Sequence, residues 1–109
     1  MSKLAQPSTK VIELSGMLVR SQVKPQLESW EKAFGDFLNE HSLVAAERPT
    51  ELVVSLEGIK RVDTSGLAVL LHAYRQADQH GVRLIFQDAS PQLLALARLC
   101  SLNKLLRLI

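Results

Sequence analysis

The sequence predicts an α/β domain in which α-helices pack on a mixed β-sheet. Two observations lead to this class: apolar runs of strand length alternate with segments of helical apolar spacing, and the order is strand, helix, strand, helix, strand, helix. The 109 residues have room for one hydrophobic core, so we expect a single domain over residues 1–109. An apolar content of 47% with 22% charged residues is ordinary for a packed globular protein.

The first predicted strand and helix lie before residue 41. Residues 9–16 (TKVIELSG) alternate apolar and polar residues imperfectly and close with glycine, as a strand does, and residues 3–5 are a candidate hairpin partner. Pro25 suits the first turn of a helix that runs to Glu40. The apolar face of this helix is predicted to contain Leu27, Trp30, Phe34 and Leu38.

The second half repeats this alternation. After a predicted loop at residues 41–51, residues 51–58 are nearly continuously apolar, like a strand covered on both faces. The next helix is predicted to end near Gly81, and residues 82–88 are the third strand. Ser90 is a predicted N-cap for a helix that opens at Pro91. The apolar faces of these two helices are predicted to be Leu67, Leu70, Leu71 and Tyr74, and Leu93, Leu96, Ala97 and Cys100.

The chain ends in an apolar segment, residues 102–109 (LNKLLRLI). Its pattern fits either a helix end or an edge strand, and it either completes the core or binds a partner. We favour completion of the core, because a small domain needs every apolar side chain it has.

Composition argues against several classes of function. The net charge is only +2 and the basic residues are scattered along the sequence, so nucleic-acid binding is not expected. His41, His72 and His80 have no partner at a metal-ligand spacing, and we predict surface positions, no metal and no cofactor. No nucleophile elbow or phosphate-binding loop is present, so we expect no enzyme. One cysteine, no signal peptide and no membrane-spanning run predict a cytoplasmic protein.

The most informative stretch is DTSGL, Asp63 to Leu67, directly before the second apolar-periodic segment. Asp63, Thr64 and Ser65 are all good helix N-caps, so the stretch has a purely structural interpretation. The same geometry would expose hydroxyl groups at the positive end of a helix, where they contact a partner or accept a phosphate. Both interpretations fit the residues.

Residues 51–90 resemble the core of a STAS domain, the fold shared by sulfate transporters and anti-sigma-factor antagonists. Asp63, Thr64, Ser65, Gly66 and Leu67 match that family's D-[ST]-[SGA]-G-L signature position by position, and residues 11–100 follow its order of elements. The resemblance implies a single STAS-like domain whose partner-binding residues are Asp63 to Leu67.

Two branches of the family fit. The segments VDTSGLAVLLH and LESWEK most resemble the MlaB type. That likeness implies a non-catalytic subunit that binds and regulates the ATPase of an ABC phospholipid transporter maintaining outer-membrane lipid asymmetry. With permease and lipid-binding subunits completing the complex, the chain would sit at the inner face of the inner membrane, attached only through that complex, with Thr64 on the ATPase-binding surface. Ser65, however, stands where anti-sigma-factor antagonists carry a phosphorylatable serine, which keeps the second branch open.

Overall fold

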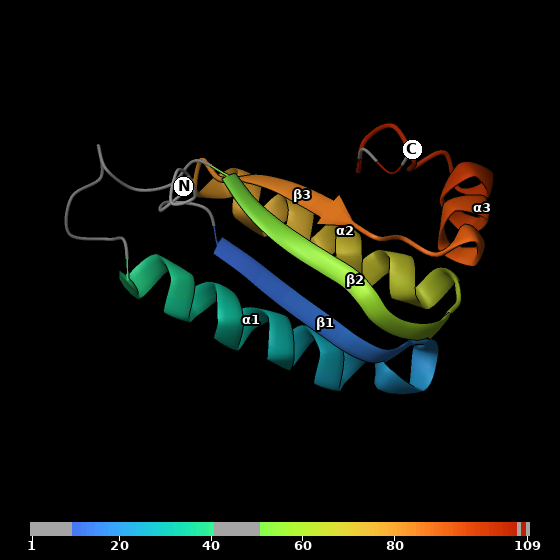
Figure 1. Cartoon of the computed structure of the whole chain (residues 1–109), viewed down its shortest axis with the longest axis horizontal. Helices are drawn as coiled ribbons and strands as arrows, with labels where there is room; N and C mark the ends of the chain where they lie inside the picture. Colours follow the sequence, from blue (N-terminus) through green and yellow to red (C-terminus); the bar gives the residue numbers. More distant parts are fainter. Residues whose placement is uncertain (1–9, 41–50, 107, 109) are drawn as a thin grey trace, which may run out of the picture.

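The computed structural model describes residues 10–40, 51–106 and 108. Their elements are β1 (Lys10–Leu18), the 3-10 helix η1 (Arg20–Gln22), α1 (Val23–Glu40), β2 (Glu51–Val62), α2 (Thr64–Gln79), β3 (Arg83–Gln87) and α3 (Pro91–Leu99). The described strands form one parallel sheet in the order β1-β2-β3 (Figure 1). The predicted α/β class is confirmed. The antiparallel strand that would make the sheet mixed was predicted at residues 3–5, outside the described residues.

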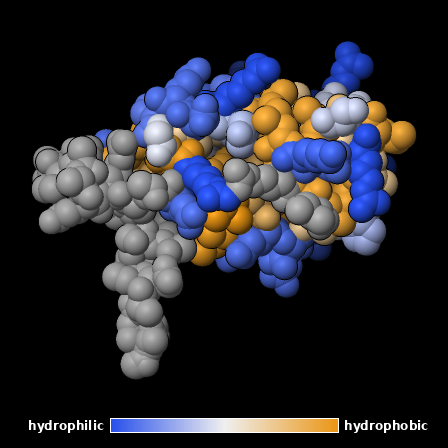
Figure 2. Space-filling model, turned by 90° about the horizontal axis from the view of Figure 1, so that it is seen from above, coloured by the Kyte–Doolittle hydropathy of each residue, from blue (hydrophilic) through white to orange (hydrophobic). Residues whose placement is uncertain are grey.

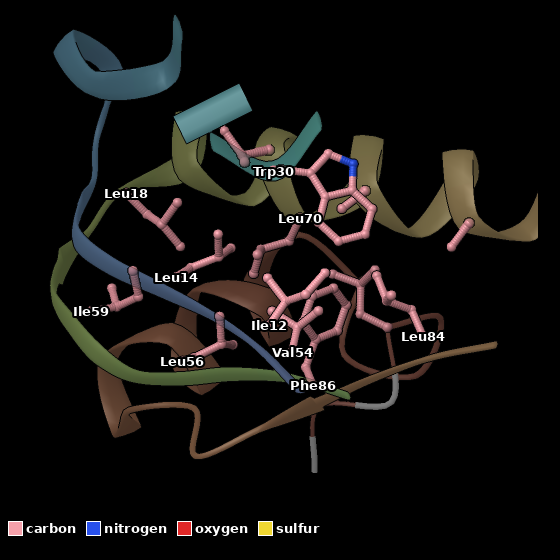
Figure 3. Packing of buried hydrophobic residues seen from close by; sticks show 14 of the residues in the cluster. Ile12, Leu14, Leu18, Trp30, Val54, Leu56, Ile59, Leu70, Leu84 and Phe86 are labelled. Carbon is pink, nitrogen blue, oxygen red and sulfur yellow. The ribbon is translucent and has the colours of Figure 1, made fainter. Parts of the chain in front are cut away.

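One face of the sheet carries the hydrophobic core. The buried strand residues of this core are Ile12, Leu14, Leu18, Leu52, Val54, Leu56, Ile59, Val62, Leu84 and Phe86. The pairing places Ile12 beside Val54 and Val54 beside Phe86, so these side chains form a row across all three strands (Figure 3). Because α1 contacts β1 and α2 contacts every strand, these helices cover the row.

An aromatic stack holds α1 in place. Trp30, Phe34 and Phe37 are almost fully buried, and their rings stack with centroid distances of 4.9 and 6.0 Å. The indole nitrogen of Trp30 donates to the Gln76 side chain at 2.8 Å, which ties α1 to α2. Phe37 is absent from the predicted apolar face, while Leu27 and Leu38 are only partly buried.

Both strand ends predicted at glycines are wrong. β1 continues past Gly16 to Leu18, and β2 continues past residue 58 to Val62. Gly16 has φ +88 and lies at register shifts in the parallel ladder, so it bends β1 without ending it. The buried Gln26 side chain donates to two carbonyl oxygens of this bend, those of Ser15 at 2.8 Å and Met17 at 3.1 Å.

The helix boundaries follow from local chemistry, with two corrections. α1 begins at Val23 rather than Pro25, because η1 leads directly into it and Pro25 still falls in the first turn, where an N–H has no helical acceptor. Ser90 caps α3 as predicted, and its hydroxyl accepts from the Leu93 N–H at 3.1 Å. Cys100 was predicted on the apolar face, but α3 ends at Leu99 and leaves Cys100 exposed at the C-cap.

The C-terminal tail completes the core. Residues 101–106 form turns rather than the helix end or edge strand predicted, yet Leu106 and Leu108 are 1% and 2% exposed. Leu99 and Leu105 remain 82% and 45% exposed. Figure 2 shows apolar surface at the end of the molecule that carries α3 and this tail.

Candidate functional site

The DTSGL stretch forms the turn between β2 and α2. β2 ends at Val62, Asp63 adopts the extended backbone of an N-cap, and α2 begins at Thr64. The turn lies at the carboxyl edge of the parallel sheet, where the strands finish and both α1 and α2 begin (Figure 1). Sites in α/β folds form at this edge because the loops there present side chains from several strands to one surface.

Asp63 joins three segments of chain. One carboxylate oxygen accepts from the Gly66 N–H at 3.1 Å and so caps α2. The other accepts from the Arg20 N–H at 3.0 Å, and the Asp63 N–H donates to the Leu18 carbonyl at 3.0 Å. Asp63 therefore caps the N-terminus of α2 and also connects it to the end of β1 and the start of η1.

This hydrogen bonding favours the ionised carboxylate. The pKa of Asp63 is lowered, chiefly by the Arg20 backbone N–H and further by the N–H groups of Gly66 and Ser65 and the charge of Arg20, against a smaller opposing effect of desolvation. Asp63 is thus a charged structural acceptor at neutral pH. Because both of its oxygens already accept backbone N–H groups, it is poorly placed to act as a general base.

Gly66 is required by close packing. A methyl group built at its Cα would overlap the Leu18 carbonyl oxygen and lie 2.7 Å from Leu18 Cβ. Gly66 is buried, and the neighbouring Leu67 is 2% exposed within the core. These two residues shape the turn from inside the domain.

Thr64 and Ser65 occupy the first and second positions of α2. Thr64 is exposed and Ser65 is half-buried, whereas Asp63, not either hydroxyl, supplies the cap. The five predicted partner-binding residues thus fall into two groups. Asp63, Gly66 and Leu67 hold the turn together, and Thr64 is its exposed residue. Whether all five residues take part in binding stays a prediction.

Arg20 and Leu18 belong to the site but were not predicted. Their contribution is a backbone N–H and a backbone carbonyl, and Arg20 lies 43 residues from Asp63. Main-chain groups carry no signal in side-chain patterns, so the sequence offered no means of finding them.

Other parts of the described chain offer weaker candidates. His72 lies exposed on α2 and contacts Glu31 of α1 at 3.2 Å, in agreement with the predicted surface role. A hollow of about 190 Å³ at the β1–β2 bend is lined by Glu13, Leu14, Ser15, Ser55, Glu57 and Gly58. Within residues 10–40, 51–106 and 108, no three His, Cys, Asp or Glu side chains are grouped to hold a metal. The helices among these residues are not long and apolar enough to cross a bilayer.

Comparison with known families identifies the fold. The family model described as "Mlab, STAS domain" matches residues 1–108. The chain belongs to the STAS domain family. Membership agrees with the signature at Asp63 to Leu67 and supports a binding and regulatory module. No curated protein sequence matches the chain significantly.

Solved structures show the same fold at low sequence identity. A sulfate transporter family protein from Wolinella succinogenes is similar with a TM-score of 0.61 and 12% identity, covering 92% of this chain and 72% of that one. Two structures of a protein named Mglu are similar with TM-scores of 0.50 and 0.53 and 18% and 19% identity. They cover 75% and 74% of this chain but only 18% and 22% of theirs, so the STAS-like fold matches a small part of a much longer protein.

Proposed function

We propose that this STAS domain is an MlaB-type subunit that binds and regulates the ATPase of an ABC phospholipid transporter. In this role it sits at the cytoplasmic face of the inner membrane, together with permease and lipid-binding subunits, and contributes to outer-membrane lipid asymmetry. It needs no cofactor and no catalysis of its own. The description of the matching family model supports the assignment.

The observation that carries the proposal is the exposure of Thr64. A threonine at a helix start is ordinarily explained by capping, but here Asp63 makes that hydrogen bond and Thr64 follows it into the helix. The residue is exposed at the carboxyl edge of the sheet. Because folding does not use Thr64 as a cap, a contact with the ATPase is the best explanation of the side chain.

Thr64→Glu tests this contact. An acid in the first turn of a helix is favourable for the dipole, so the variant should fold. In an interface it would bury a bulkier, charged side chain, and we expect at least about 30-fold weaker binding to the purified ATPase subunit. Gln92→Glu introduces the same charge in the first turn of α3 and serves as the control. A folded Thr64→Glu protein that binds like wild type would remove Thr64 from the interface.

A second candidate is an anti-sigma-factor antagonist controlled by phosphorylation of Ser65. Ser65 is half-exposed at the second position of α2, next to the ionised Asp63. A phosphate adds a charge of about −1.5 to −2 there, favourable for the helix dipole but repelled by Asp63, and it would displace a partner bound over the turn. Intact-mass analysis of the protein from growing and stressed native cells, with and without phosphatase, tests this. A Ser65 that stays unmodified in both conditions argues for the transporter.

A further inference from the structure

Four exposed basic residues lie on segments at the carboxyl edge of the sheet, where α2 begins: Arg20, Lys24, Lys60 and Arg61, called here the basic rim. Lys60 and Arg61 are at the end of β2, directly before the turn. Arg20 begins η1, which contacts α2 and whose first N–H is bonded to Asp63, and Lys24 follows in the first turn of α1. The fold thus gathers four scattered charges at one edge of the sheet.

Acidic side chains of the described residues do not neutralise this rim. Elsewhere Lys32 pairs with Asp36 at 3.6 Å and Arg83 with Glu51 at 3.7 Å. Among the described residues no rim side chain makes such an ion pair. Asp63 is the acid within the turn, and its ionised carboxylate, which interacts with the charge of Arg20, offsets one of the four positive charges. The rim therefore keeps a net positive charge.

Helix stability does not account for this arrangement. Lys24 is the second residue of α1, and neither α1 nor α2 has an acid in its first turn. The two helices begin at the same end of the sheet, so the positive ends of their dipoles add to the rim charge (Figure 1). Basic residues at helix starts are repelled by the positive ends of the helix dipoles, which opposes folding. An anionic binding partner would relieve this repulsion.

Two exposed residues suited to a protein contact lie at the same edge. Met17 is 38% exposed and pairs with Arg61 in the β1–β2 ladder, and Thr64 is exposed at the helix start. Exposed apolar and hydroxyl groups beside charged side chains are typical of protein interfaces. The surface consists of helix ends and a turn, and it is not the side of an amphipathic helix, which is a common membrane-binding form.

We propose that the basic rim binds an acidic surface on the partner protein and accelerates its association by charge attraction. The inference rests on the proposed function, because it describes the partner of the same site. Electrostatic steering of this kind raises the association rate constant and weakens as salt increases.

The test compares two charge-matched double variants. Lys60→Glu/Arg61→Glu reverses two of the four rim charges and so cancels the net charge of the four positions, and Arg75→Glu/Lys104→Glu makes the same charge change at exposed positions elsewhere. Association with the purified ABC ATPase subunit is followed at about 50 and about 300 mM salt, after melting curves show both variants folded. We expect the rim variant to associate about tenfold or more slowly at low salt, a smaller difference at high salt, and little effect of the control.

Failure of the inference and of the proposed function give different results. Equal association of wild type and the rim variant with the ATPase would overturn the acidic partner surface and leave the transporter role intact. Wild type could instead fail to bind the ATPase but bind a purified kinase-type anti-sigma factor, with weaker binding by the rim variant. That result would overturn the transporter role and support the acidic protein partner. Rim-dependent binding only to vesicles of about 30% phosphatidylglycerol would make the surface a membrane site and overturn the inference. Binding to none of the three probes would overturn both proposals.

Discussion

The starts of α2 and α3 have the same capping hydrogen bond, but only the cap of α2 is also bonded to a distant part of the chain. In each, a side-chain oxygen accepts from the N–H three residues later at 3.1 Å, Asp63 from Gly66 and Ser90 from Leu93. The Ser90 cap is a local contact. The Asp63 cap has a second oxygen bonded to Arg20, and its third helical residue is a glycine pressed against Leu18. α2 is therefore fixed by tertiary contacts at its start, and the hydroxyl of its first residue, Thr64, does not supply the cap.

The largest expected effect is that of Gly66→Ala. Its methyl group would overlap the backbone carbonyl of Leu18, which cannot move without disturbing β1, so we expect a loss of about 3 kcal/mol or more in the free energy of unfolding. Gly35→Ala is the control: that position lies inside α1 with open space around it, and alanine should stabilise the helix by about 0.5–1 kcal/mol. Urea unfolding followed by circular dichroism measures both. Equal stability of the two variants would contradict the packing argument.

The next effect separates the two caps. Ser90→Ala should cost about 0.5–2 kcal/mol, the usual value of an N-cap. Asp63→Ala should cost more, because it removes the acceptor for Arg20 as well as the cap. Asp63→Asn should fall between them, since the amide keeps one acceptor oxygen but presents an NH₂ group to the other N–H. If Asp63→Ala and Ser90→Ala cost the same in urea unfolding, the bond to Arg20 adds nothing.

Lowering the pH should also distinguish the Asp63 cap from the Ser90 cap. Because the pKa of Asp63 is lowered in the folded state, the unfolded chain binds the proton more readily. The stability that Asp63 contributes is therefore complete above its unfolded pKa of about 3.9 and disappears as pH falls through the lowered folded value. We expect the stability difference between wild type and Asp63→Asn to shrink over this range. The stability difference between wild type and Ser90→Ala should stay constant, because serine does not titrate in this pH range. If both stability differences changed with pH in the same way, the charged role of Asp63 would be refuted.

The smallest expected effect is that of Thr64→Ala on folding. Thr64 is exposed and does not cap, and alanine is the better helix former, so the free energy of unfolding should change by no more than about 0.5 kcal/mol. Differential scanning calorimetry beside wild type measures this. A loss as large as that of Ser90→Ala would mean that Thr64 shares the capping role and would weaken its assignment to the interface.

Most of the elements were predictable because their signals are local. Helical spacing around Trp30 and Leu70, and the Ser90-Pro91 helix start, lie within a few neighbouring residues and gave the order of elements correctly. The errors came where pairing overrode local signals. Gly16 bends β1 without ending it, because the parallel ladder resumes beyond it and the distant Gln26 satisfies the bend.

The candidate site divides in the same way. The sequence alone determined that Asp63 to Leu67 open a helix, because capping depends on side chains three residues apart. The cap at Asp63 is confirmed, but the identity of the backbone that Gly66 approaches, that of Leu18, and the meeting of Arg20 with Asp63 came from the tertiary structure. The physical reason is distance along the chain: Arg20 and Asp63 are 43 residues apart, and their meeting depends on the parallel pairing of β1 with β2, which no local pattern encodes.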